Sequence, residues 1–176
     1  KGSFGACLMQ DKKLVRNCLE AMQINKNIEV SIKCRIGLGK NFNYAYFEEF
    51  IEEVLKSGIK IVYVHSRNAI LSGISPKENR TIPPLNYDFV RKIKNRFPKV
   101  TFILNGGIDN IEKALKLSKL YDGVMVGRLI QNNPFCLRKI DSIFYGSSNN
   151  TFNENTIHEY FEFIKPNIGK DSIFRL

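Results

Sequence analysis

The chain has 176 residues, which is enough for one domain with a substantial core, or for one domain and the start of another. Hydrophobic residues make up 43% of it, which excludes an intrinsically disordered chain. No apolar run reaches the ~20 residues of a membrane span, so we expect no membrane partner. The net charge of +10 favours a polyanionic partner such as nucleic acid, although a lysine-rich coding bias explains it equally well.

Helical and strand periodicities alternate along the chain. A first helix begins after Asp11, which can cap it, and its apolar residues Leu14, Cys18 and Met22 share one face. Strands are predicted at 28–37, 59–65, 100–107 and 122–128, with helices between them at 46–58, 87–97 (capped by Asn86) and 110–120. This alternation indicates parallel strands joined by right-handed crossovers.

The C-terminal part of the chain has a different pattern. A short helix is predicted at 132–140, and the segment 145–155 has the composition of a linker. Beyond the linker, Ile157, Tyr160, Phe161 and Ile164 form one helical stripe. We therefore expect a first domain at 1–144, a linker at 145–155, and the truncated start of a helical domain at 156–176.

The cysteines argue against a metal site. Cys7, Cys18, Cys34 and Cys136 form no Cys-x-x-Cys pair, and the chain has two histidines, so we expect no metal. Cys18 and Cys34 lie in apolar patterns, which predicts two buried thiols in a reducing compartment. Because the sequence does not begin with Met, we expect an excerpt, and a cytoplasmic or an organellar location stays open.

Polar residues at the strand ends favour a barrel over a doubly wound sheet. Strand side chains alternate between two faces, and Lys33, His65, Asn105 and Gly127 all fall at or near the C-terminal ends of consecutive strands. A (β/α)8 barrel gathers its functional residues at that end. We therefore predict an α/β fold of the TIM-barrel type, with about four parallel strands and their helices in this chain.

Two glycine motifs at the strand ends predict a phosphate site. Gly106 and Gly107 follow the third strand and let backbone amides approach a ligand where a Cβ would obstruct it. Gly127 and Arg128 follow the fourth strand and add amides and a guanidinium. Asn105 can bond a ligand ring or brace the loop. Alternatively, these glycines only make tight turns; the chain has no G-x-G-x-x-G and no P-loop motif.

Cations accompany the glycine motifs. Lys33 and Arg35 share one face of an apolar strand, which favours an anionic ligand over a surface ion pair. His65 can donate to the same ligand, or it is a core histidine with a protein partner. In the long loop that follows, Lys77 and Arg80 either lie in a solvated turn or contact a nucleic-acid phosphate.

Six collinear motifs resemble one family. They are GACLM, KCRIG, VHSR, SPKENR with IPPL and YD, NGGI and DGVMVGR, and they cover about residues 1–140. In order and spacing they are similar to the tRNA-dihydrouridine synthases, and SPKENR is particular to the bacterial type A branch, which acts on D-loop uridine. The resemblance implies an oxidoreductase with a (β/α)8 barrel that carries FMN, a helical domain that helps to hold tRNA, and NADPH as the reductant. It also implies that this chain is the C-terminal half of that TIM barrel, with about four of its eight strands.

The resemblance also implies roles for individual residues. It assigns FMN contacts to Lys33, His65, Asn105, Gly106, Gly107, Gly127 and Arg128. Arg35 is expected near the flavin or the target base, and Lys77 and Arg80 match positions that contact tRNA. In the implied reaction, hydride passes from the flavin to C6 of a flipped-out uridine and a cysteine protonates C5.

That proton-donating cysteine is expected upstream of residue 1. In the family it stands in an Asn-x-Gly-Cys-Pro motif shortly before GACLM, so Cys7 is not expected to be the acid, and no catalytic residue is expected in this chain. We therefore expect no synthase activity from the 176 residues alone. Two other functions stay open for the whole protein. One is another FMN barrel oxidoreductase that acts on a small molecule, and the other is a flavin-free scaffold that binds tRNA.

Overall fold

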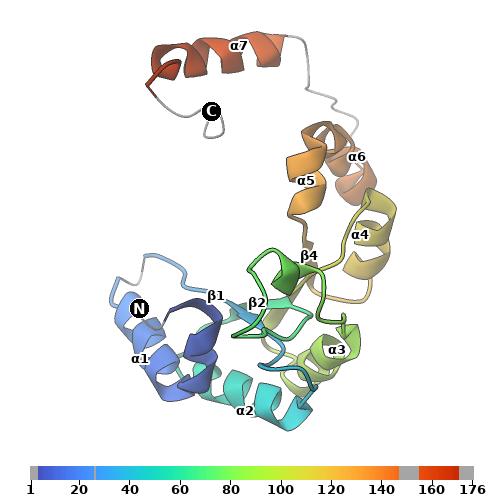
Figure 1. The fold of residues 1–176 in the computed structure, drawn as a ribbon. Coiled ribbons are helices and arrows are strands. Elements are labelled where there is room, and N and C mark those ends of the chain that lie inside the picture. Colours follow the sequence, from blue (N-terminus) through green and yellow to red (C-terminus); the bar gives the residue numbers. More distant parts are fainter. Residues whose placement is uncertain (1–3, 26, 147–154, 171–176) are drawn as a thin grey trace. The chain divides into compact units, whose positions relative to one another are not determined.

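The computed structural model describes residues 4–25, 27–146 and 155–170, and the chain divides into two compact units (Figure 1). The first unit comprises Lys1–Asn132 and the second comprises Asn133–Leu176. All residues predicted to bind a ligand lie in the first unit. Residues 147–154 of the predicted linker at 145–155 lie outside the described residues, so the predicted boundary at 144 stays a prediction.

Four parallel strands form the sheet of the first unit. They are β1 (Ile32–Arg35), β2 (Ile61–His65), β3 (Thr101–Asn105) and β4 (Gly123–Met125), in the order β1-β2-β3-β4. Each strand lies beside its neighbours in sequence, as in a barrel, whereas a doubly wound sheet reverses its order at a switch point. The predicted α/β class and half-barrel topology are confirmed. Strand β1 is shorter than predicted, because only these four residues pair with β2.

The helices of the first unit have the predicted caps. They are α1 (Lys12–Met22), which follows the 3-10 helix η1 (Gly5–Gln10), and then α2 (Tyr44–Leu55), α3 (Tyr87–Arg96), α4 (Ile111–Ser118) and α5 (Arg128–Asn132). The Asp11 and Asn86 side chains cap α1 and α3 by accepting a backbone N–H, as predicted. Asn43 and Asn110 cap α2 and α4 in the same way.

One face of the sheet is buried against the helices, and the other is partly open. Val62, Val64, Phe102 and Leu104 have no solvent exposure. They form one core with apolar side chains of α2 and α3, among them Phe47, Phe50, Ile51, Val54, Val90 and Ile93. Strand residues of the opposite parity are half-buried or exposed, apart from His65. The open face is therefore the face that carries the predicted site.

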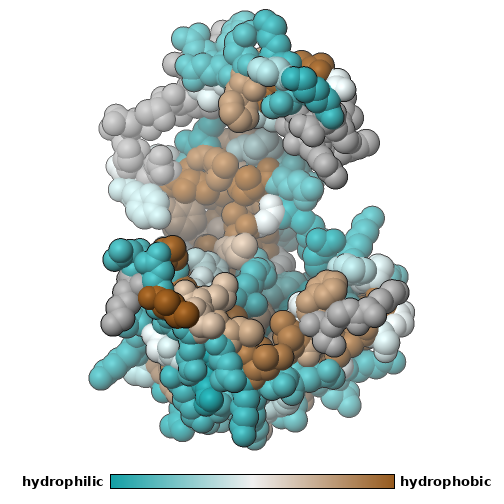
Figure 2. Space-filling view, turned by 90° about the vertical axis from the view of Figure 1, so that its left-hand side faces the viewer, coloured by the Kyte–Doolittle hydropathy of each residue, from teal (hydrophilic) through white to brown (hydrophobic). Residues whose placement is uncertain are grey.

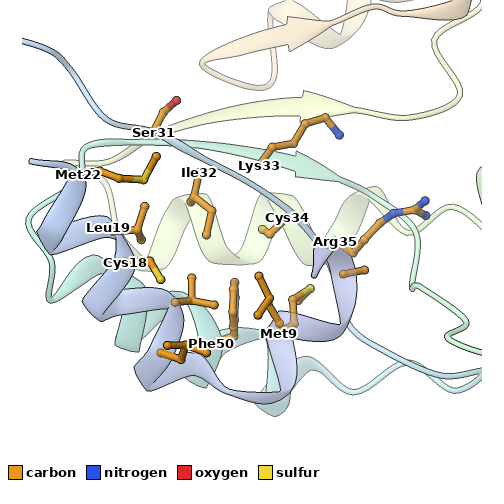
Figure 3. A pocket seen from close by; sticks show the side chains of 15 residues that line it. Met9, Cys18, Leu19, Met22, Ser31, Ile32, Lys33, Cys34, Arg35 and Phe50 are labelled. Atoms are coloured by element: carbon orange, nitrogen blue, oxygen red, sulfur yellow. The ribbon is translucent and has the colours of Figure 1, made fainter. Parts of the chain in front are cut away.

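A groove of about 490 Å3 runs between β1 and α1 (Figure 3). Ile32 and Cys34 point from β1 into it, whereas Lys33 and Arg35 point away (Figure 3). Burial raises the pKa of the Cys34 thiol to about 12, and this cysteine is buried as predicted. The same prediction is wrong for Cys18, which is exposed because the apolar face of α1 lines the groove instead of a closed core. Figure 2 views this side and shows brown apolar side chains exposed among hydrophilic ones.

The second unit is helical. It contains η3 (Pro134–Lys139), α6 (Ile140–Tyr145), α7 (Asn155–Ile164) and η4 (Lys165–Asn167). The short helix predicted at 132–140 is mainly the 3-10 helix η3, with Pro134 in its first turn. The apolar residues Ile157 and Phe161 of α7 are exposed. Among the helices of the described residues, none is long and apolar enough to cross a membrane.

Candidate active site

Three predicted site residues form one row across the open face. In the strand register, Arg35 pairs with His65, His65 with Asn105, and Asn105 with Met125. Lys33 lies one row earlier, where it pairs with Tyr63. Because parallel strands end at the same edge of a sheet, this register brings Arg35, His65 and Asn105 together at the C-terminal edge.

Positive charge accumulates around His65. Burial, followed by the charges of the nearby Arg35, Lys33, Arg67 and Arg128, lowers the pKa of its imidazole to about 3. The guanidinium groups also repel one another: burial, then Arg67 and Arg80, lowers the pKa of Arg35. We call Lys33, Arg35, Arg67, Arg80 and Arg128 the cation cluster. None of the five forms an ion pair with a carboxylate in the part of the chain that the structure describes.

The turn after β3 packs directly on His65. Gly106 has a φ of +109°, and a Cβ there would stand 2.5 Å from Cδ2 and 2.9 Å from Nε2 of His65. Gly107 has a φ of +65°, and its Cβ would stand 2.4 Å from Cδ1 of Leu85. Both positions therefore require glycine for the fold itself. Within the described residues, neither the Gly106 nor the Gly107 N–H donates to a protein acceptor.

The turn after β4 is built differently. At Gly127 a Cβ would meet nothing within 4 Å, so protein packing does not require glycine there. The neighbouring Arg128 is exposed and donates through Nη2 to the carbonyl oxygen of Arg80 at 3.3 Å. The open space at Gly127 leaves room for a ligand beside the cation cluster.

Asn105 braces two strands. Its Nδ2 donates to the carbonyl oxygen of Met125 at 2.7 Å, which ties the end of β3 to β4. Its own carbonyl oxygen accepts from the backbone N–H of Ser66 at 2.9 Å and from Ser66 Oγ at 3.0 Å. Of the two functions that the sequence left open for Asn105, the structure contains the bracing bonds; its Oδ1 is the atom that could meet a ligand.

Arg35 anchors the loop between β2 and α3. Its Nη1 donates to the carbonyl oxygens of Asn68 at 3.2 Å and Asn79 at 2.9 Å. Asn79 in turn clamps Ile70: its Oδ1 accepts from the Ile70 N–H at 2.8 Å and its Nδ2 donates to the Ile70 carbonyl at 2.7 Å. The Arg35 side chain thus links the open face of the sheet to the SPKENR motif, whichever ligand it contacts.

The SPKENR motif begins with a capping box. The Ser75 N–H donates to Glu78 Oε2 at 2.7 Å, and the Glu78 N–H donates to Ser75 Oγ at 3.2 Å. This pair nucleates η2 (Glu78–Arg80) and leaves Lys77 and Arg80 exposed. Arg80 belongs to the cation cluster through its effect on Arg35, whereas no contact joins the Lys77 side chain to the site within the described residues.

Sequence reasoning missed two residues at this site. Arg67 lies beside Arg128, and its guanidinium donates to the carbonyl oxygen of Pro83. Tyr87 begins α3, and its hydroxyl donates to the carbonyl oxygen of Gly106 at 2.7 Å. The two-residue spacing of His65 and Arg67 was the available signal for the arginine. Among the described residues, no three His, Cys, Asp or Glu side chains gather where they could hold a metal ion.

The fold and the charge distribution define a class: a parallel half-barrel whose open strand ends carry a cationic site suited to an anionic ligand. The model of the dihydrouridine synthase (Dus) family matches residues 1–170. Proteins named tRNA-dihydrouridine(20/20a) synthase are 42% identical over 145 residues in Xanthomonas campestris, 40% over 158 in Shewanella oneidensis and 43% over 144 in Pasteurella multocida. The chain therefore belongs to the dihydrouridine synthase family, and the relatives' name corresponds to the predicted type A branch.

The chain spans less than half the length of these relatives. The three matches cover 82%, 90% and 82% of this chain, but 43%, 47% and 44% of the relatives. A solved structure of N-acetylneuraminate lyase from Mycoplasma synoviae aligns with 92% of this chain and 65% of its own, at 11% identity. Its TM-score of 0.33 is too low to bear on the fold.

Proposed function

We propose that the whole protein reduces a D-loop uridine of tRNA to 5,6-dihydrouridine, with FMN bound at the strand ends and NADPH as its reductant. The observation that carries the proposal is a cation cluster beside two glycine amides, where the described residues supply neither a carboxylate for the cations nor an acceptor for the amides, in a chain of the dihydrouridine synthase family. Bound FMN would supply the hydride that the uridine receives.

The turns fit the phosphate of FMN. A phosphate carries negative charge and several acceptor oxygens, which match the unpaired N–H groups of Gly106 and Gly107 and the guanidinium of Arg128. Gly127 leaves open space where a phosphate could approach the backbone. We assign the ribityl and phosphate portions of FMN to these four residues together with Asn105.

Lys33 and His65 are assigned to the flavin portion of FMN. With a pKa of about 3, the His65 imidazole is neutral at physiological pH in the ligand-free site, so it can donate one hydrogen bond there. Burial and the neighbouring Arg35 lower the pKa of the Lys33 ammonium. An anionic ligand beside Lys33 would raise this pKa again, because it stabilises the charged ammonium. The same attraction would tighten binding of the ligand.

The basic loop is assigned to tRNA. Lys77 and Arg80 are exposed and sit on the SPKENR turn, which the Ser75–Glu78 hydrogen bonds close, so they can contact backbone phosphates. The net charge of +10 adds attraction that does not depend on RNA sequence. A uridine inside folded RNA must leave its stack to reach a flavin at the strand ends, and Arg35 is assigned to the flavin or to this base.

The 176 residues alone are proposed to be inactive. In the first unit, the Cys34 thiol is buried on the opposite face of the sheet, and Cys7 Sγ, in η1, donates to the carbonyl oxygen of the preceding Phe4 at 2.9 Å. Cys18 is on α1, beside the groove. These placements support the proposal that none of the three thiols protonates C5 of the uridine.

The test uses the whole protein, tRNA from cells that lack its gene, and NADPH. We expect a yellow protein whose flavin is reoxidised by this tRNA, with dihydrouridine found in the D-loop by mass spectrometry. Flavin reoxidation by small enones or quinones, but not by tRNA, would replace the proposal with a small-molecule oxidoreductase. A colourless protein that takes up no added FMN yet binds tRNA would favour the scaffold.

A further inference from the structure

Tyr87 holds the glycine turn in one orientation. The Tyr87 hydroxyl donates to the carbonyl oxygen of Gly106 at 2.7 Å. The hydroxyl oxygen of Tyr87 also lies 3.2 Å from the position that a Cβ on Gly107 would take. The turn is thus confined by His65 beneath Gly106 and by Leu85 and Tyr87 beside Gly107. Tyr87 is not part of any glycine motif, and it reaches the turn from the next helix of the chain.

The bond to the Gly106 carbonyl also sets the direction of an N–H group. The peptide unit between Gly106 and Gly107 is planar and trans, so its carbonyl oxygen and the Gly107 N–H point in opposite directions. Glycine on both sides gives this unit more rotational freedom than any other pair of residues would. By fixing the carbonyl oxygen, the Tyr87 hydroxyl aims the Gly107 N–H away from itself; no acceptor for this N–H stands among the described residues.

Tyr87 is itself held by the surrounding structure. Its carbonyl oxygen accepts from the Tyr121 hydroxyl at 2.9 Å, and the preceding Asn86 N–H donates to the carbonyl oxygen of Ser66 at 2.8 Å. Burial raises the pKa of the Tyr87 phenol, so the hydroxyl keeps its proton and stays a donor at neutral pH. The side chain therefore has a fixed origin and a constant protonation state.

We propose that Tyr87 is a positioning residue for the phosphate of the cofactor, because it orients the Gly107 amide toward that phosphate. The inference rests on the proposed function, in which the Gly106–Gly107 turn holds the phosphate of FMN. Tyr87 touches neither cofactor nor substrate in this role; it acts through the peptide unit.

The test measures binding of FMN and of riboflavin, which lacks the phosphate, to the whole apoprotein. Tyr87→Phe removes only the hydroxyl and is expected to raise the Kd for FMN about tenfold while leaving the Kd for riboflavin unchanged. Tyr46→Phe is the matched control: it also removes a half-buried hydroxyl that donates to a backbone carbonyl, that of Met9 at 2.6 Å, but leaves the Gly106 carbonyl bonded, and its FMN affinity is expected within about twofold of wild type.

Each outcome separates the two proposals. An equal loss of FMN and riboflavin affinity in Tyr87→Phe would mean general damage to the site and would overturn the positioning role. Unchanged affinity for both ligands would overturn it as well. If wild type binds riboflavin and FMN equally well, the proposed phosphate site is wrong. If wild type binds neither ligand, the proposed function itself is wrong.

Discussion

Replacing Gly106 by alanine tests whether the glycine turn is packed on His65. A Cβ at Gly106 would stand 2.5 Å from Cδ2 and 2.9 Å from Nε2 of His65, and 3.1 Å from Ser66 Oγ. The φ of +109° adds backbone strain of about 1–3 kcal/mol for a residue with a Cβ. The imidazole lies in a row between Arg35 and Asn105, so it can move aside only by disturbing the sheet edge. We expect Gly106→Ala to lower the free energy of unfolding by about 3 kcal/mol.

Gly127→Ala is the matched control. A Cβ at Gly127 meets nothing within 4 Å, so the apoprotein is expected to keep its stability within about 0.5 kcal/mol. Urea unfolding of the whole apoprotein, followed by circular dichroism, measures both variants. If Gly106→Ala unfolds at the same urea concentration as wild type, the turn does not pack on His65 and the geometry of the site is wrong. FMN binding is the second readout: Gly127→Ala should weaken it by more than tenfold, because the methyl group fills the space assigned to the phosphate.

Three further predictions concern His65 and the cationic side chains. As the pH falls from 6.5 to about 4.5, the free energy of unfolding of wild type should drop more steeply than that of His65→Asn, by up to about 1.4 kcal/mol per pH unit. The reason is that the unfolded imidazole takes up a proton in this range, whereas the folded one, with a pKa of about 3, does not. Equal slopes in urea titrations would show that His65 is not held neutral. Arg35→Met removes the donor to two loop carbonyls, which should lower the free energy of opening the loop by about 1–3 kcal/mol and speed proteolysis within residues 66–84. Lys77→Met should leave the cleavage rate unchanged. Similar rates in both variants would mean that Arg35 does not anchor the loop. Lys77→Ala and Arg80→Ala should each weaken tRNA binding and reduce the salt dependence, in log–log form, by about 0.7–0.9; a slope equal to that of wild type would exclude a phosphate contact.

Local signals in the sequence predicted the elements well. Asp11 and Asn86 have short side chains that accept a backbone N–H, and both cap helices where the apolar pattern begins. The alternation of strand side chains correctly assigned Val62 and Val64 to one face of β2 and His65 to the opposite face. Such features depend on residues within one or two turns of each other, which is the range that a single sequence records.

Long-range features were outside that reach. The bond from Tyr87 to the Gly106 carbonyl joins residues that are 19 apart, and the bonds of Arg35 to Asn68 and Asn79 join residues 33 and 44 apart. Their existence depends on strand register and loop path, which periodicity does not specify. The exposure of Cys18 has the same origin, because an apolar helix face does not reveal what covers it. The Ser75–Glu78 capping box is visible in the sequence as Ser-x-x-Glu, but the segment was interpreted only through its charges, as a turn.

If the two glycine turns hold a phosphate, their backbone amides must respond to FMN. The direct measurement follows the amide resonances of whole apoprotein labelled at glycine while FMN is added, with riboflavin as the comparison. We predict large shifts for Gly106, Gly107 and Gly127 with FMN and much smaller ones with riboflavin. Saturable FMN binding that leaves these three resonances in place would contradict the assignment of the phosphate to the strand ends.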